Sequence, residues 1–398
     1  MRKFLLAGAA FAAAAAYMPT ARADSPVTVY IGGRVFAGVF VGSSTGQNAG
    51  AVKIGDENYP TYMRLYPTAD YAAPNGIHYG FTAELRSSNN GAMRYGAPSS
   101  QLYWEHEAAY VSSTAFGKLT FGTPTPVLET IQVGAQNDIG SGGYDGEFGW
   151  NGANGGPMWL FTDVDETKTS IDYYSPSFAG FGFAVGFMPY DNNTANNENV
   201  NSGPLGSVPS IDRNKNRVDA ALTYGNTIGP VGLKATVGGR FASVVKDTTV
   251  GDLGYQNMHI IDVGVEATIA GIGVGGHLDT GKFGGGGNVY EPLPDGAKST
   301  TAFIVGVQYA VPNPAVPLSF GASYMHYSID GSQYGLPIGS TVKADGGALG
   351  ASYKLVPGVS LFLDALYAQQ KASDGLELVA GHKQVDSQGL GIGTYFQW

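Results

Sequence analysis

Apolar and polar residues alternate along most of the chain with a period of two, the pattern of a β-strand with one apolar face. Ile77, Phe81 and Leu85 fall on one face of such a strand, and Glu84 and Arg86 fall on the other. The same alternation occurs in sixteen segments, which start near Val27, Thr61, Gly76, Gln101, Phe116, Glu166, Gly180, Arg217, Pro230, Asn257, Gly271, Lys298, Val316, Thr341, Val359 and Val385.

The connections between these segments alternate between short and long. Ser175–Gly180 and Val356–Gly358 are short, whereas 124–165 and 191–216 are long. An even number of strands with short turns on one side and long loops on the other is typical of transmembrane barrels. We therefore predict an all-β fold, an antiparallel up-and-down barrel of 16 strands that spans a membrane.

A soluble β-sandwich is the alternative fold, because period-two alternation alone is compatible with both a sandwich and a transmembrane barrel. Many of the segments are about 10–14 residues long, close to the ≈ 9–11 residues of a tilted membrane crossing. Sandwich strands are nearer 5–6 residues. The strand lengths favour the barrel.

The first residues have the pattern of a secretory signal peptide. Arg2 and Lys3 are followed by an Ala-rich apolar stretch and by the small-x-small pattern Ala21-Arg22-Ala23. We expect residues 1–23 to be a cleaved signal peptide, with a signal anchor as the weaker alternative, and residues 24–398 to form the barrel.

The composition agrees with an exported β-protein and argues against nucleic acids as partners. The chain has 60 Gly, 24 Tyr and 19 Phe but no Cys, so its stability cannot come from disulfides. Without residues 1–23 it carries 19 basic and 32 acidic side chains, a formal net charge of −13. This charge argues against nucleic-acid partners and favours a weak preference for cations.

Three stretches resemble the Gram-negative general porins, the trimeric, sixteen-stranded family. They are Phe116-Gly-Lys-Leu-Thr-Phe-Gly-Thr123, the Ser-Pro turn of Lys168-Thr-Ser-Ile-Asp-Tyr-Tyr-Ser-Pro-Ser-Phe178 with Gly180-Phe181 after it, and the aromatic-ended Gly389–Trp398. The resemblance implies a homotrimeric outer-membrane channel for passive diffusion of ions and small hydrophilic solutes. It also implies contact with outer-membrane lipid and lipopolysaccharide, and recognition of the last strand by the barrel assembly machinery. The family usually ends in Phe, whereas this chain ends in Trp398.

In that family the third long loop folds back into the barrel and narrows it, and residues 124–165 occupy the matching place. The acidic residues of this predicted constriction loop are Glu129, Asp138, Asp145, Glu147, Asp163 and Asp165, and the loop has no Lys or Arg. By strand parity, a basic ladder of Arg34, Arg64, Arg86 and Lys118 points into the lumen. Facing an acidic loop, such a ladder would create a transverse field that orients polar solutes.

Other side chains receive simpler interpretations. His78, His277 and Glu84 fall on the lumen face, where we expect solvated wall residues. Aromatic residues near strand ends on the lipid face predict interfacial girdles: Tyr79, Tyr110, Tyr173, Tyr224, Tyr309, Tyr367, Phe396 and Trp398. No cofactor is expected, since six scattered His and no Cys argue against structural zinc. A loop-bound calcium, for example in residues 191–201, is the one exception considered.

Three other functions compete with the general porin. A substrate-selective channel for sugar, phosphate or another nutrient would need an aromatic track or a dense basic ring. An outer-membrane enzyme would need a nucleophile dyad, which the sequence does not supply, so we expect no enzymatic activity. A structural or adhesion barrel would not conduct ions.

Overall fold

The computed structural model describes residues 27–45, 57–87, 102–134, 140–142, 169–190, 214–244, 256–283, 295–330, 339–373, 375–378 and 381–398. The predicted signal peptide lies outside these residues. No helix in these ranges is long and apolar enough to cross a membrane.

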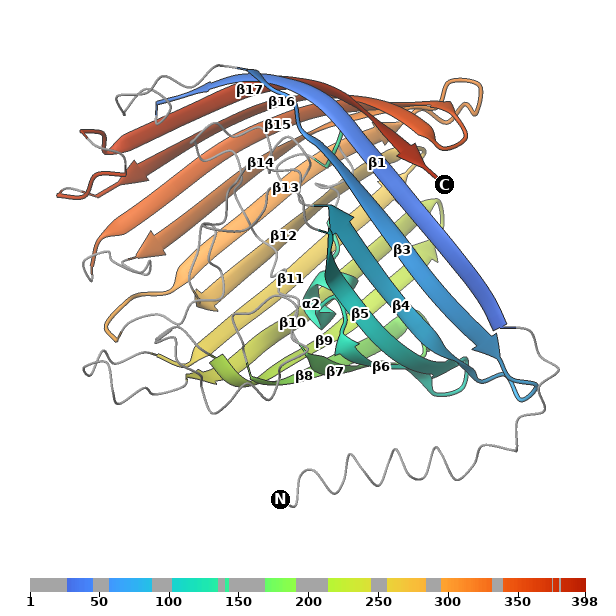
Figure 1. The fold of residues 1–398 in the computed structure, drawn as a ribbon. Helices are drawn as coiled ribbons and strands as arrows, with labels where there is room; N and C mark the ends of the chain where they lie inside the picture. The colour runs from blue at the N-terminus through green and yellow to red at the C-terminus, as the bar shows by residue number, and fades with distance from the viewer. Residues whose placement is uncertain are drawn as a thin grey trace.

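The described residues form one antiparallel barrel of sixteen strands, with a seventeenth, two-residue strand, β2, beside them (Figure 1). The strands are β1 (Val27–Ser44), β2 (Glu57–Asn58), β3 (Thr61–Ala72), β4 (His78–Ser87), β5 (Leu102–Ser113), β6 (Gly117–Thr123), β7 (Ser170–Tyr174), β8 (Phe181–Tyr190), β9 (Asn214–Ile228), β10 (Val231–Val244), β11 (Met258–Ile269), β12 (Ile272–Lys282), β13 (Thr300–Ala310), β14 (Leu318–Asp330), β15 (Thr341–Val356), β16 (Val359–Ala372) and β17 (Gln384–Gln397). Each of the sixteen predicted segments corresponds to one of these sixteen strands, so the predicted fold is confirmed.

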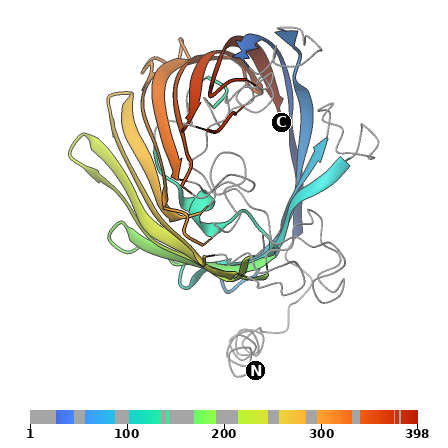
Figure 2. The ribbon, with the colours of Figure 1, turned by 90° about the vertical axis from the view of Figure 1, so that its left-hand side faces the viewer.

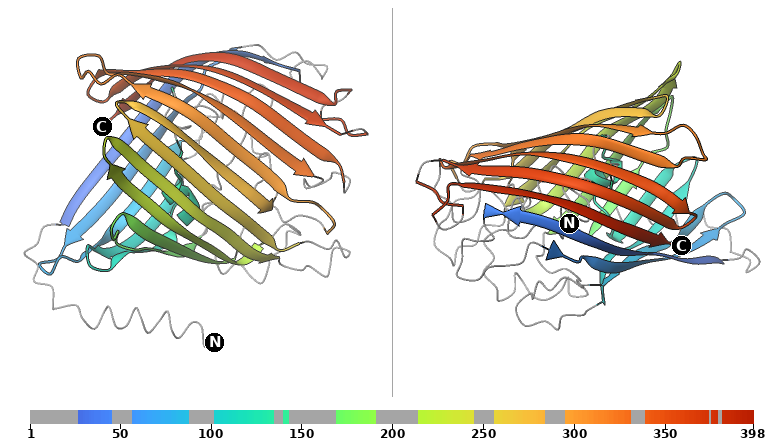
Figure 3. Two further views of the ribbon diagram at one scale, coloured as in Figure 1. Left: turned by 180° about the vertical axis from the view of Figure 1, so that it is seen from behind. Right: turned by 90° about the horizontal axis from the view of Figure 1, so that it is seen from above.

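The barrel closes because β1 pairs with β3 on one side and with β17 on the other. In this seam Arg34 is opposite Gln397, and Gly33 and Trp398 exchange two backbone hydrogen bonds of 3.1 Å each. All strands tilt in the same sense around the barrel (Figure 3). Because the ring of described strands is closed, each of them has a neighbour on both sides, and this matters in the hydrocarbon, where each unsatisfied backbone group costs several kcal/mol.

Short turns join the strands at one rim, and left-handed residues make the tightest of them. Ala270 (φ 48°) and Gly271 (φ 84°) connect β11 to β12. Positive φ at both central residues matches the type I′ hairpin, whose twist suits that of the flanking strands. The turn fixes the β11–β12 register, so that Ile269 lies opposite Ile272 and Asp262 opposite Asp279.

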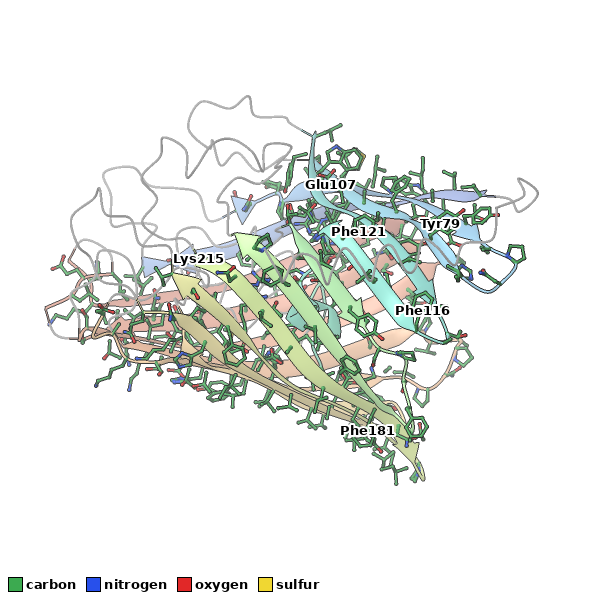
Figure 4. The ribbon with its side chains drawn as sticks, turned by 90° about the horizontal axis from the view of Figure 1, so that it is seen from below. Tyr79, Glu107, Phe116, Phe121, Phe181 and Lys215 are labelled. Carbon is green, nitrogen blue, oxygen red and sulfur yellow. The ribbon has the colours of Figure 1, made fainter. Side chains whose placement is uncertain are left out.

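The two faces of the wall differ as the alternation predicts. On the outer face Leu222 is 60% exposed and Ile392 is 62% exposed. On the inner face Asp219 is 3% exposed and Arg240 is fully buried. The outer surface of β4–β9 carries aromatic side chains along the edge with the short turns, while Glu107 and Lys215 lie toward the opposite edge (Figure 4).

Aromatic pairs on the outer face support an interfacial girdle near the short turns. Ring centroids lie 4.7 Å apart for Tyr71–Tyr79 and for Phe181–Tyr224. The prediction for Tyr110 is wrong. Its hydroxyl donates to the carboxylate of Asp70 inside the barrel, because one extra residue in β5 reverses the parity of that strand.

The alternation predicts an inner face that is polar throughout, but the structure differs from this prediction. A buried apolar cluster lies on the inner faces of β1 and β13–β16: Phe36, Phe40, Ala302, Ile304, Met325, Tyr327, Ile329, Val342, Ala344, Ala348, Phe362, Leu366 and Ala368. Phe36 stacks on Phe362 at 5.4 Å, and Leu376 and Leu378 from the β16–β17 connection pack against the cluster. Part of the interior is therefore packed, and a uniformly wet lumen is not what the structure shows.

A matched pair of substitutions in β13 tests the assignment of the two faces. Val305 is exposed on the outer face, and Gln308 belongs to the inner face of the same strand. We expect Val305→Arg to lower the free energy of unfolding by about 2–4 kcal/mol, because it places a charge in lipid. Gln308→Arg should change it by less than about 0.5 kcal/mol. Urea titration in lipid vesicles measures both, and equal losses would contradict the assignment.

Candidate functional site

The connection between β6 and β7 begins inside the barrel with a short helix, α2 (Val127–Ile131). Val127 and Leu128 are buried, and α2 contacts the inner faces of β8, β9 and β10. In a view toward one end of the barrel, the ring of strands encloses α2 (Figure 2). The described start of the predicted constriction loop thus lies in the lumen.

Further along, the same connection contacts other parts of the inner wall. A Cβ atom on Gly264 of β11 would collide with the carbonyl oxygen of Val133, so the loop backbone rests directly on that strand. The Ser141 backbone N–H donates to both carboxylate oxygens of Asp364 in β16, at 3.2 and 3.0 Å. The described loop residues therefore reach from the β8–β11 wall to β16.

Gly140 allows this second attachment. Its φ of 56° is in the left-handed region, and a Cβ atom there would overlap the Asp364 carboxylate. Asp364 is fully buried. Leaving a buried hydrogen-bonding group without its partner costs about 1–3 kcal/mol, so the Asp364 side chain is a substantial anchor for the loop.

Of the predicted acidic loop residues, the structure describes one. Glu129 lies in the first turn of α2 and is partly buried. Asp138, Asp145, Glu147, Asp163 and Asp165 lie outside the described residues, as does the possible calcium segment 191–201.

Three members of the predicted basic ladder lie side by side on the inner wall. Arg34 of β1 is directly opposite Arg64 of β3, and Arg64 is directly opposite Arg86 of β4. The guanidinium carbons of Arg34 and Arg64 lie 5.4 and 4.7 Å from the ring centroid of Tyr62. We call Arg34, Arg64 and Arg86 the arginine row.

The arginine row is paired with carboxylates that the sequence analysis did not assign to it. Glu84 lies 2.6 Å from Arg86 Nε and 3.4 Å from Arg64 Nη1, and Glu105 lies 3.2 Å from Arg86 Nη1. Glu84 is buried rather than solvated. Glu105 is the extra residue of a β-bulge between β4 and β5, and simple alternation does not place such a residue on either face.

The fourth predicted member, Lys118, also faces the lumen but lies away from the row. It is opposite Ser112, which is opposite His78 at the start of β4. Its ammonium nitrogen is 5.2 Å from the ring centroid of Tyr110. Lys118 and His78 border a cavity of about 490 Å³ near the short turns. Lys118 thus belongs to the vestibule at the turn side.

The wall behind α2 carries a second charged group. Arg240 of β10 donates to both carboxylate oxygens of Asp219 in β9, at 2.8 and 2.7 Å, and Arg217 bonds the same carboxylate at 3.2 Å. Parity places Arg240 on the lumen face. Its burial comes from tertiary packing, which alternation does not report.

His277 is not the solvated wall residue that we expected. It is 2% exposed and lies between two equally buried carboxylates, Asp262 and Asp279. His78, in contrast, is exposed as predicted and pairs with Asp70 at 3.0 Å. Asp262 faces Asp279 because of the two-residue turn, a signal that was available in the sequence.

Comparison with known proteins agrees with this architecture. The profile of the Gram-negative porin family matches residues 5–374. No curated protein sequence matches the chain.

Similar solved structures include an anion-selective porin from Comamonas acidovorans, with a TM-score of 0.56, 16% identity and coverage of 94% of this chain and 100% of that chain. Salmonella typhi OmpF in complex with daunomycin has a TM-score of 0.58 and 12% identity, covering 93% and 97%. The trimer form of in-vitro folded OmpT from Vibrio cholerae has a TM-score of 0.54 and 15% identity, covering 94% and 99%. At these identities the likeness shows a shared fold.

Removing the Asp364 carboxylate tests the loop attachment. We expect Asp364→Ala to increase open-channel current noise and conductance in planar bilayers, because the Ser141 backbone loses its acceptor. Asp386→Ala is the matched control, since Asp386 bonds Gln369 on the outer face. Recordings from Asp364→Ala that match the wild type would contradict the anchor.

Proposed function

Since the chain belongs to the Gram-negative porin family and forms a bacterial outer-membrane channel for passive diffusion, we propose that its arginine row and constriction loop sort small hydrophilic solutes and ions by charge. The observation that carries this proposal is the register of Arg34, Arg64 and Arg86 on three neighbouring strands. Charged side chains fixed at the same depth in a pore jointly set the electrostatic potential that ions and solutes meet at that depth.

The anchored loop supports the proposal from the other side of the lumen. A loop that contacts β8–β11 and β16 narrows the path between these walls. Ions then pass close to fixed charges, where Coulomb interactions are strong enough to discriminate. Two charges 4 Å apart interact by about 1 kcal/mol even in water, and by more where water is partly excluded.

We propose a weak preference for cations. The arginine row is partly neutralised by Glu84 and Glu105, so it does not act as an uncompensated anion site. The predicted acidic loop residues and the formal charge of −13, from 19 basic and 32 acidic residues after position 23, favour cations near the pore.

We further infer that the chain acts as a channel without enzymatic activity, and that it assembles as a homotrimer. Family membership supports the first inference. The similarity to an outer membrane protein solved in a trimer form supports the second. Lipid, lipopolysaccharide and the barrel assembly machinery are the partners that an outer-membrane location implies.

The arginine row is tested by removing one charge. We expect Arg64→Gln to raise the cation-to-anion permeability ratio about two- to fivefold, equivalent to about 0.5–1 kcal/mol from one fixed charge in water. Reversal potentials in salt gradients measure this ratio. Lys371→Gln removes the same charge from the outer face of β16 and serves as the control. An unchanged ratio in Arg64→Gln, or an equal change in both variants, would refute the proposal.

The acidic loop is tested in the same way. If Asp145 and Glu147 line the constriction, the Asp145→Asn, Glu147→Gln double variant should lower the permeability ratio of cations to anions. The sign is opposite to that for Arg64→Gln, so the two experiments check each other. No change would remove both residues from the constriction.

A further inference from the structure

Three buried side chains converge on one point of the inner wall, in β11 and β12. Asp262 and Asp279 are directly opposite each other, and His277 precedes Asp279 by two residues, so all three share the inner face. His277 Nε2 lies 3.1 Å from Asp262 Oδ2 and 3.4 Å from Asp279 Oδ2. Their exposed fractions are only 1–2%.

Hydrogen bonding does not satisfy this group. His277 Nδ1, Asp262 Oδ1 and Asp279 Oδ1 have no hydrogen-bond partner, and His277 Nε2 lies within ion-pair distance of two carboxylate oxygens without a well-directed hydrogen bond to either. The buried hydroxyl of Thr236, on the neighbouring strand β10, is also without a partner. Buried polar atoms are normally paired, and leaving one unpaired costs about 1–3 kcal/mol. Such a concentration of unpaired atoms points to a missing ligand.

A metal ion fits the spacing of these atoms. The candidate ligand atoms all lie within 4.8 Å of one another. Zn²⁺ binds imidazole nitrogen and carboxylate oxygen at about 2.0–2.2 Å, which places neighbouring ligand atoms about 3.0–3.6 Å apart. The observed separations of 3.1 and 3.4 Å fall in this range. An imidazolium bound to both carboxylates would have to aim one Nε2 proton at two oxygens.

Charge is compatible with this assignment. As metal ligands, two ionised carboxylates and a neutral imidazole carry a charge of −2, which a divalent cation compensates in a site closed to solvent. When Nε2 binds a metal, Nδ1 carries the proton and needs an acceptor. The Thr236 hydroxyl and the Val133 carbonyl oxygen lie near Nδ1, because all three atoms surround the position that a Cβ atom on Gly264 would occupy.

We propose that Asp262, His277 and Asp279 bind one divalent transition-metal ion of the Zn²⁺ type in the barrel wall, beneath the constriction loop. The mixed nitrogen and oxygen donors suit Zn²⁺ and disfavour Ca²⁺, which takes six to eight oxygen ligands. The site does not depend on the proposed charge selectivity.

The test uses untagged full-length chain, refolded in detergent with Zn²⁺ because the site is closed in the folded barrel. After desalting, metal analysis should give one Zn²⁺ per chain, and excess Ca²⁺ should not reduce it. X-ray absorption at the Zn edge should show one imidazole with oxygen neighbours. Zinc should also raise the melting temperature. Absence of retained zinc would overturn the proposal.

Variants separate this site from other histidines. His277→Gln and Asp279→Asn should each weaken zinc binding at least tenfold. His78→Gln, which alters the exposed His78–Asp70 pair, should bind zinc as the wild type does. Heat-dependent migration on gels checks that each variant folds. If a variant does not fold, the absorption spectrum of the wild type still decides, because coordination without imidazole would refute the site.

Discussion

Backbone hydrogen bonding around a closed ring is the constraint on which the rest of the structure depends. Lipid offers no donors or acceptors, so every strand must pair on both sides. The seam between β1 and β17 completes the ring. Once strand order and register are fixed, each side chain faces either lipid or the interior, and the arrangement of charges inside follows from the same ladder that closes the barrel.

Most of the fold was predictable because period-two alternation persists through nearly every strand. It fails where a residue is inserted. The bulge at Glu105 moved Tyr110 to the interior and brought an unassigned carboxylate to Arg86. A bulge changes the phase of one strand without changing its composition, so parity counted from one end of β5 gives the wrong face at the other end.

The site was predictable to the extent that it depends on parity and turn length. Parity placed Arg34, Arg64 and Arg86 on one face, but the register was needed to separate Lys118 from them. His277 shows the opposite case. Counting outward from the Ala270-Gly271 turn places Asp262 opposite Asp279, two residues from His277. The spacing of histidines along the chain, which is the usual search for metal ligands, does not identify these two carboxylates.

The apolar cluster on the β13–β16 side has a consequence for transport through the barrel. Phe36, Phe362, Leu376 and their neighbours occupy part of the cross-section that sixteen strands enclose. Hydrated ions avoid such a surface, so their route is displaced from the central axis toward the polar wall of β3–β6. The cross-sectional area that the strands enclose is therefore only an upper bound on the water-filled area. Two barrels of equal strand number can differ widely in electrical resistance for this reason alone.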